Sequence, residues 1–182
     1  MWSNLVSNPR RGLRLFGLLV LALGVGALTL PSLGRMSSQG VSILDLQFMR
    51  TSENAVEQVA RLRPSGVDAA QMAHYLDFPM LVIYGLGLSA LCMVLSARAA
   101  DRGRARVAAF GTGAAWFALF AAAFDAVEDV AILLVLDGRT EQPWPAIATG
   151  FAVAKWVAIA VVGVYLVVGV ARTAERVDVA VD

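Results

Sequence analysis

The stretch VAAFGTGAAWFALFAAAFDAVEDVAILLVL, residues 107–136, decides the fold, because it is long enough to cross a membrane as a helix and yet contains acids. Apolar segments of about 20 residues cross bilayers as helices. The acids are Asp125, Glu128 and Asp129. Each costs roughly 2.5 to 3.5 kcal/mol at the centre of a membrane helix on insertion scales. We therefore expect partners, water or protons to compensate them.

The composition of the chain is that of an integral membrane protein. Apolar residues make up 58% of its 182 residues, whereas soluble domains have roughly 45–50%, and the mean hydropathy is +0.68. The net charge of +1 gives no basic field for nucleic acid. The single cysteine, Cys92, excludes an intrachain disulfide and a CxxC motif. We expect the lipid bilayer as a partner and no nucleic acid.

Four apolar segments predict an all-α fold, an integral membrane four-helix bundle that forms a single domain. The expected spans are residues 13–30, 75–97, 107–136 and 146–171. The first segment also has the basic and apolar parts of a signal peptide. Its apolar part is long for a signal peptide and no cleavage pattern follows it, so a retained anchor is the preferred interpretation.

The outer loop at 31–74 contains apolar residues throughout, so we expect it to fold over the bundle. Ser52 is expected to cap a short helix at 53–63, and Pro64-Ser65-Gly66 to end that helix. Asp68 is expected to cap the following helix. The short helix is either a lid over a site beneath it or a packed loop helix.

The distribution of arginine predicts the orientation of the chain. Arginine is dense before the first span, between the second and third spans, and after the fourth. The positive-inside rule places these segments in the cytoplasm. We therefore expect a multi-pass protein of the cell membrane, such as the bacterial inner membrane, with both termini cytoplasmic.

Small residues at four-residue spacing predict close helix packing, because membrane helices associate where their backbones can approach. The third span has Ala114, Ala118, Ala122 and Ala126, and the fourth has Gly150, Ala154 and Ala158. Such stripes also occur at dimer faces, so a homo- or hetero-oligomer stays open.

The charges of the third span share one face of its helix. Asp129 is four residues and Glu128 three residues after Asp125. The only lysine, Lys155, should lie level with Val127 on the antiparallel fourth span. Both Glu128 and Lys155 lie about 12 to 14 Å below the outer ends of their spans. The sequence therefore predicts a polar cluster in the outer half of the membrane.

Three side chains in or directly before the second span are expected to join this cluster. His74 and Asp77 should form its rim, and Tyr84, which shares the face of Asp77, should add a hydroxyl. Two interpretations remain open: a water-accessible ligand-binding pocket that opens outward, or a buried ion pair that holds two helices in register. The excess of acids over one lysine favours a cation, an amine or protons as the missing partner.

Two segments carry a resemblance to known proteins. At HYLDFPMLVIYG (74–85) and FDAVEDVAILL (124–134) the chain resembles small four-span bacterial membrane proteins of unknown function. In outline it is also similar to the EXPERA group of sterol isomerases and sigma-2-type receptors. That likeness implies an apolar pocket for a sterol or an amine above acidic groups. His74 and Asp77 do not reproduce the spacing of that group, so no catalytic residue is carried over and the catalytic residues stay unknown.

Three functions are compatible with these features. The first is binding of a small cationic or amphipathic ligand, a lipid or a sterol-like molecule in the acidic pocket. The second is a structural or assembly subunit of a membrane complex. The third is an intramembrane isomerase that uses a carboxylic acid and a carboxylate, although no feature marks a substrate.

The sequence contains no motif for a nucleotide, a serine nucleophile or a zinc site, and it has one histidine. We therefore expect no cofactor and no metal centre. Carboxylate-only binding of a hard cation at the acidic triplet stays open, as does the question of whether the protein is an enzyme.

Overall fold

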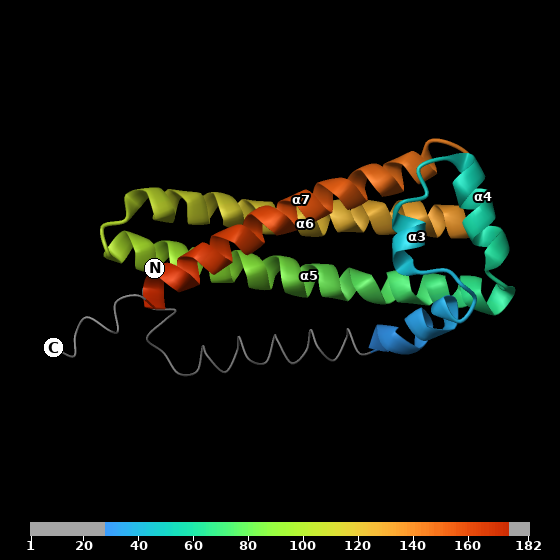
Figure 1. Ribbon diagram of the computed structural model, residues 1–182, viewed down its shortest axis with the longest axis horizontal. Helices are drawn as coiled ribbons and strands as arrows, with labels where there is room; N and C mark the ends of the chain where they lie inside the picture. The colour runs from blue at the N-terminus through green and yellow to red at the C-terminus, as the bar shows by residue number, and fades with distance from the viewer. Residues whose placement is uncertain (1–27, 175–182) are drawn as a thin grey trace.

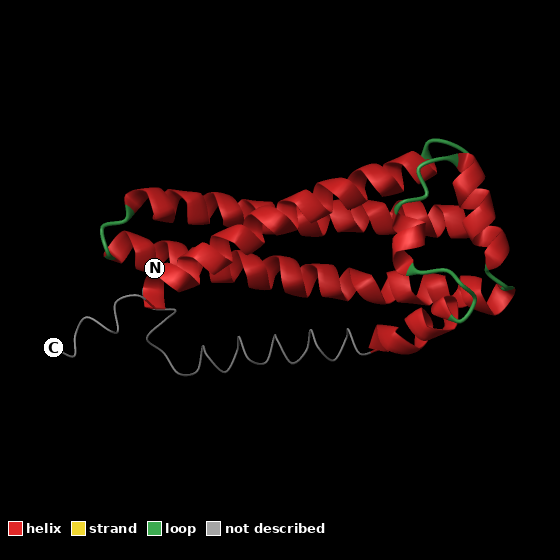
Figure 2. Ribbon diagram, viewed as in Figure 1, coloured by secondary structure: helices red, strands yellow, loops and turns green. Residues whose placement is uncertain are grey.

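The computed structural model describes residues 28–174, with side chains through residue 169, and all the regular structure in this part is helical. After helical backbone at 28–37 come α3 (Ile43–Gln47), α4 (Ser52–Arg61), α5 (Pro64–Asp101), α6 (Ala105–Leu136) and α7 (Trp144–Ala174). The long helices α5, α6 and α7 lie side by side, and α3 and α4 lie across one end (Figure 1). Short loops join them (Figure 2). The expected all-α class is confirmed; the expected first span at 13–30 lies almost wholly outside the described residues.

Two of the helices, α5 and α7, are long and apolar enough to cross a membrane. Only 22% of the most apolar window of α5 and 28% of that of α7 is buried inside the protein. Large apolar side chains such as Leu86 and Trp156 therefore lie exposed. Exposed apolar surface on this scale is expected where a protein faces lipid.

The second long helix begins eleven residues before the expected span, at Pro64 rather than at residue 75. Proline is favoured in the first turn of a helix, where its missing N–H is not needed. Pro64 therefore starts α5 two residues after Leu62, the C-cap of α4, and Arg63 between them is the N-cap of α5. Asp68 lies inside α5 and does not cap it, and the cap of α4 is Thr51 instead of Ser52.

Small residues bring α6 close to its neighbours. Ala114 and Ala118 of the expected stripe are buried, and the Cα of Gly85 on α5 approaches α6 so closely that an added Cβ would lie 2.7 Å from Ala122. On α7 the expected stripe is offset. Gly150 is exposed, whereas the buried face runs through Ala148, Ala152 and Ala158. The reason is that this face also carries Lys155, which must turn toward the acids of α6.

The cap formed by residues 36–49 and α4 closes one end of the bundle. Met36, Leu46 and Met49 are at most 1% exposed and pack into one apolar cluster with Ile132 of α6. The cap is also tied to the start of α7, because the Arg50 N–H donates to Thr149 Oγ1 over 3.0 Å. The segment at 31–74 is therefore folded, as its apolar content predicts.

A second apolar cluster fills the other end of the bundle. It contains Cys92, Ala118, Val162 and Tyr165. Along α6 this cluster ends before Asp125, and the cluster beneath the cap begins after Asp129. The charged turns of α6 therefore lie between two apolar cores.

Candidate functional site

Lys155 is held by two carboxylates of α6. Its ammonium donates a hydrogen bond to Asp125 Oδ1 over 2.7 Å. It also lies 2.7 Å from Glu128 Oε2, as an ion pair that lacks the alignment of a hydrogen bond. The side chains of these residues are at most 8% exposed. The structure thus brings the lysine to the level of the acids, as the hairpin register predicts.

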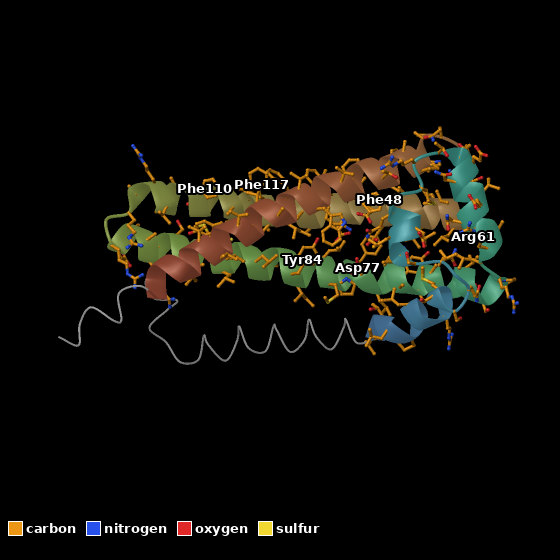
Figure 3. All side chains as sticks on the ribbon, viewed as in Figure 1. Phe48, Arg61, Asp77, Tyr84, Phe110 and Phe117 are labelled. Carbon is orange, nitrogen blue, oxygen red and sulfur yellow. The ribbon has the colours of Figure 1, made fainter. Side chains whose placement is uncertain are left out.

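Tyr84 binds the other oxygen of the same aspartate. Its hydroxyl, on α5, donates to Asp125 Oδ2 over 2.8 Å. Both oxygens of Asp125 are therefore occupied, one from α7 and one from α5. Figure 3 shows Tyr84 and Asp77 along α5. They are seven residues apart in the sequence, which is about two helical turns.

His74 pairs with the last acid of the triplet. Its Nδ1 and Asp129 Oδ1 are joined by a hydrogen bond of 2.7 Å, and both side chains are at most 2% exposed. The other ring nitrogen, Nε2, is also buried and has no hydrogen-bond partner among the described residues. The expectation that His74 forms a rim is therefore not what the structure describes, because the ring lies inside the bundle. Its neighbours Ala70 and Ala73 on α5 are buried as well, at most 3% exposed.

The carboxylate that lies close to Asp125 and Asp129 is Asp77 of α5, and not Glu128. One carboxylate oxygen from each of Asp77, Asp125 and Asp129 lies within 4.8 Å of the others. Asp77 is only partly buried, whereas the other two are at most 6% exposed. It is the carboxylate nearest to the surface, in agreement with its expected place at the rim.

The network carries more negative than positive groups. Four carboxyl groups, on Asp77, Asp125, Glu128 and Asp129, lie near one ammonium and one imidazole. Even when the imidazole is protonated, the acids exceed the cations by two. Among the described residues, Glu128 Oε1 and Asp129 Oδ2 are buried without a hydrogen-bond partner. Protons or a bound cation must balance this excess, because an isolated buried charge is very costly.

The cap covers the end of the bundle at which the sequence predicts an opening. One turn beyond Asp129, the apolar cluster of the cap covers the end of the bundle with Leu46 and Met49. The partly exposed members of the network are Asp77 and Tyr84, both on α5. The network therefore comes nearest to the surface on the side of the bundle formed by α5.

Sequence reasoning named every side chain of this network but missed its pairing. Spacing within one helix shows which residues share a face, but not which residue of a neighbour each one meets. The acids of α6 thus divide: Glu128 turns to Lys155, while Asp129 turns to His74 and Asp77. No signal within α5 alone indicates that Tyr84 would bind Asp125.

The geometry also matches the chemistry of a hard cation only in part. Carboxylate oxygens are the ligands that such cations prefer, and Asp77, Asp125 and Asp129 supply three of them. The Lys155 ammonium occupies one oxygen of Asp125, however, and places a positive charge beside the group. An organic ammonium ion, or protons on the carboxyl groups, suits this site better than a multivalent metal ion.

Comparison of the chain with protein-family models, with curated proteins and with solved structures finds no match. The function must therefore be argued from the geometry.

Proposed function

We propose that this protein is a multi-pass membrane protein that binds a small amphipathic cation, such as an organic amine, at the acidic network of α5, α6 and α7. In this proposal the long helices and the segment 13–30 cross the membrane, and the arginine-rich segments and both termini face the cytoplasm. The network lies in the outer half of the bilayer. An amine supplies the positive charge that the four acids lack.

One observation carries the proposal. Buried carboxylates exceed the cationic groups around them, and Asp129 Oδ2 and Glu128 Oε1 have no hydrogen-bond partner. A pair that only held helices in register would need one acid for Lys155. The additional acids are costly inside a membrane, and acids that are kept there usually have a function.

The surroundings of the network favour an amine with an apolar body. Apolar clusters lie on both sides of the acids along α6. Asp77 and Tyr84 are partly exposed on a helix that is apolar enough to face lipid. A ligand dissolved in the bilayer could therefore approach Asp77 with its ammonium while its hydrocarbon part stays in lipid.

Octylamine is a suitable probe, and octan-1-ol is its uncharged control. We expect octylamine to raise the thermal stability of the full chain in nanodiscs in a concentration-dependent manner, because a ligand that binds only the folded state stabilises it. Octan-1-ol should leave it unchanged. Equal responses to both compounds would contradict the proposal.

The variant Asp129→Asn tests the site itself. Its amide oxygen can still accept the hydrogen bond from His74, but one negative charge of the network is lost. We expect octylamine to bind at least about tenfold more weakly, which corresponds to 1.4 kcal/mol. Asp137→Asn, the same change at an exposed position just after α6, is the matched control. If Asp129→Asn does not fold, Asp77→Asn at the partly exposed acid takes its place.

A second candidate function rests on the His74–Asp129 pair. A histidine that is oriented by a carboxylate and has its other nitrogen free is arranged as a general acid or base. His74 Nε2 has no partner among the described residues. An intramembrane isomerase would use this nitrogen to move a proton. Turnover of a sterol or isoprenoid by the purified protein, lost in Asp129→Asn, would support it; amine binding without turnover would favour the first proposal.

A further inference from the structure

The end of the bundle opposite the cap has two adjoining hollows along the seam between α6 and α7. The smaller has a volume of about 250 Å³ and the larger about 410 Å³. Both are lined by Arg106 and Phe110. The smaller continues along α7 past Val164 and Val168, and the larger continues along α6 past Gly113 and Phe117.

The sequence explains why this seam is open. Gly113 has no side chain, and nothing lies within 4 Å of the place where its Cβ would be. Phe110 is 56% exposed and lies against Tyr165, with 6.1 Å between the ring centroids. It therefore stands between the two hollows as a common wall instead of filling either of them.

The charge at the shared mouth is a single guanidinium. Arg106 lies in the first turn of α6, is exposed, and forms no ion pair with any described residue. Arg98, Arg102 and Arg104 lie within the same turn region, with Asp101 as its acid. An arginine fork binds phosphate oxygens in a bidentate manner. Basic residues at a membrane surface also attract anionic lipids.

We infer that this groove binds one anionic diacyl phospholipid, with its phosphate on Arg106 and one acyl chain in each hollow, on either side of Phe110. Two hollows under one cationic mouth match a two-chain lipid better than a single-chain fatty acid. The walls are apolar side chains that suit hydrocarbon. This inference rests on the membrane placement of α5 and α7 but not on amine binding at the acidic network.

The test uses the full chain, delipidated in detergent and titrated with palmitoyl-oleoyl phosphatidylglycerol, with bound lipid counted by native mass spectrometry. Palmitoyl-oleoyl phosphatidylcholine, which has the same chains and no net charge, is the control lipid. We expect one phosphatidylglycerol per chain, bound at least about fivefold more tightly than phosphatidylcholine. Equal binding of the two lipids would overturn the inference.

Two pairs of variants separate headgroup from chains. Arg106→Gln should reduce the preference for phosphatidylglycerol at least fivefold, whereas Arg98→Gln, which removes an arginine that lines neither hollow, should not. Gly113→Phe should fill the larger hollow and weaken binding of both lipids. Gly163→Phe is its control, because it also points into open space but lines neither hollow.

Equal loss in Arg106→Gln and Arg98→Gln would mean that only general surface charge attracts the lipid, and would overturn the site. Unchanged lipid binding in Gly113→Phe, together with an altered oligomeric state, would assign the groove to a second copy of the chain and also overturn it. The amine assay on the same variants keeps the two proposals distinct, since none of these positions touches the acidic network.

Discussion

Lys155 has two carboxylates at 2.7 Å, but only Asp125 accepts a hydrogen bond from it. Asp125 also accepts from Tyr84, so it joins α5, α6 and α7 at one point. Glu128 places a second carboxylate beside the ammonium, but without the geometry of a hydrogen bond. We therefore expect Asp125 to contribute most to stability, while Glu128 and Asp129 keep buried oxygens without a hydrogen-bond partner.

The first prediction concerns Asp125. We expect Asp125→Asn to lower the free energy of unfolding by roughly 1.5 to 3 kcal/mol, since it removes the charged acceptor to which Lys155 and Tyr84 both donate, while Glu128 stays beside the ammonium. Reversible unfolding in mixed micelles provides the measurement. Asp137→Asn, at an exposed position, should change it by less than about 0.5 kcal/mol. A similar loss of unfolding free energy in both variants would show that the pair of Asp125 and Lys155 contributes no particular stability.

The second prediction separates the two acids that face Lys155. Double-mutant cycles that combine Lys155→Met with either Asp125→Asn or Glu128→Gln measure the coupling free energy of each pair. The hydrogen-bonded pair with Asp125 should have a coupling of about 1 to 3 kcal/mol, and the pair with Glu128 a smaller one. A larger coupling for Glu128 would contradict the described geometry.

At the scale of elements, α5 and α6 depend on close approach. The third prediction is that Gly85→Ala lowers stability by roughly 1 to 3 kcal/mol, because its Cβ would lie 2.7 Å from Ala122 and force the helices apart. Gly87→Ala is the control on the same helix, with nothing within 4 Å of the new Cβ. It should be neutral or stabilise by up to about 1 kcal/mol through helix propensity. Thermal unfolding in detergent compares them, and equal effects would be inconsistent with a tight crossing.

The cap contains a pH-dependent element at the start of α3. The Ser42 backbone N–H and its hydroxyl both donate to Asp45 Oδ2, over 2.7 and 2.8 Å. These hydrogen bonds, the backbone one first, lower the pKa of Asp45 below its ordinary value of 3.8. The stabilisation is therefore fully present above pH 3.8 and is lost as the pH falls through the lower pKa of the folded state.

The fourth prediction follows from that sign. Asp45→Asn should speed hydrogen exchange of the α3 amides relative to the unmodified chain at pH 7, and the difference should shrink once the pH falls below 3.8. Hydrogen exchange read by mass spectrometry after equilibration at each pH gives the comparison. Asp68→Asn, at an exposed site on α5, serves as the control. A difference that stays constant down to pH 2.5 would exclude the hydrogen bonds between Ser42 and Asp45 as its source.

At the scale of the whole molecule, the sequence predicts the helices better than their contacts. Long apolar runs predict α6 and α7 within a few residues at their described ends, and the all-helical class follows from them. The start of α5 was missed because Pro64 could end one helix or begin another. The buried face of α7 was missed because Gly150 and Ala154 offer an equally regular stripe, and only the position of Lys155 decides between the two faces.

For the candidate site, too, the sequence predicts which residues take part better than it predicts how they contact one another. Charge inside an apolar run identifies Asp125, Glu128 and Asp129 without a structure, because membrane segments rarely keep such residues. The lysine follows from hairpin register. The burial of His74 does not follow, since it depends on how α5 packs against α6, and the cap above the site depends on how the segment before α5 packs on the bundle. The periodicity of apolar residues within one segment does not show how that segment packs against distant parts of the chain.

The most direct test of a buried, cation-deficient network is an NMR spectrum of the side-chain ¹⁵Nζ of lysine in nanodiscs, because Lys155 is the only lysine and gives one signal. Our account predicts a charged ammonium whose protons exchange slowly with water, and whose resonance shifts as octylamine, but not octan-1-ol, saturates the protein. A signal that exchanges as fast as a solvent-exposed lysine, or that is unmoved by octylamine, would contradict it.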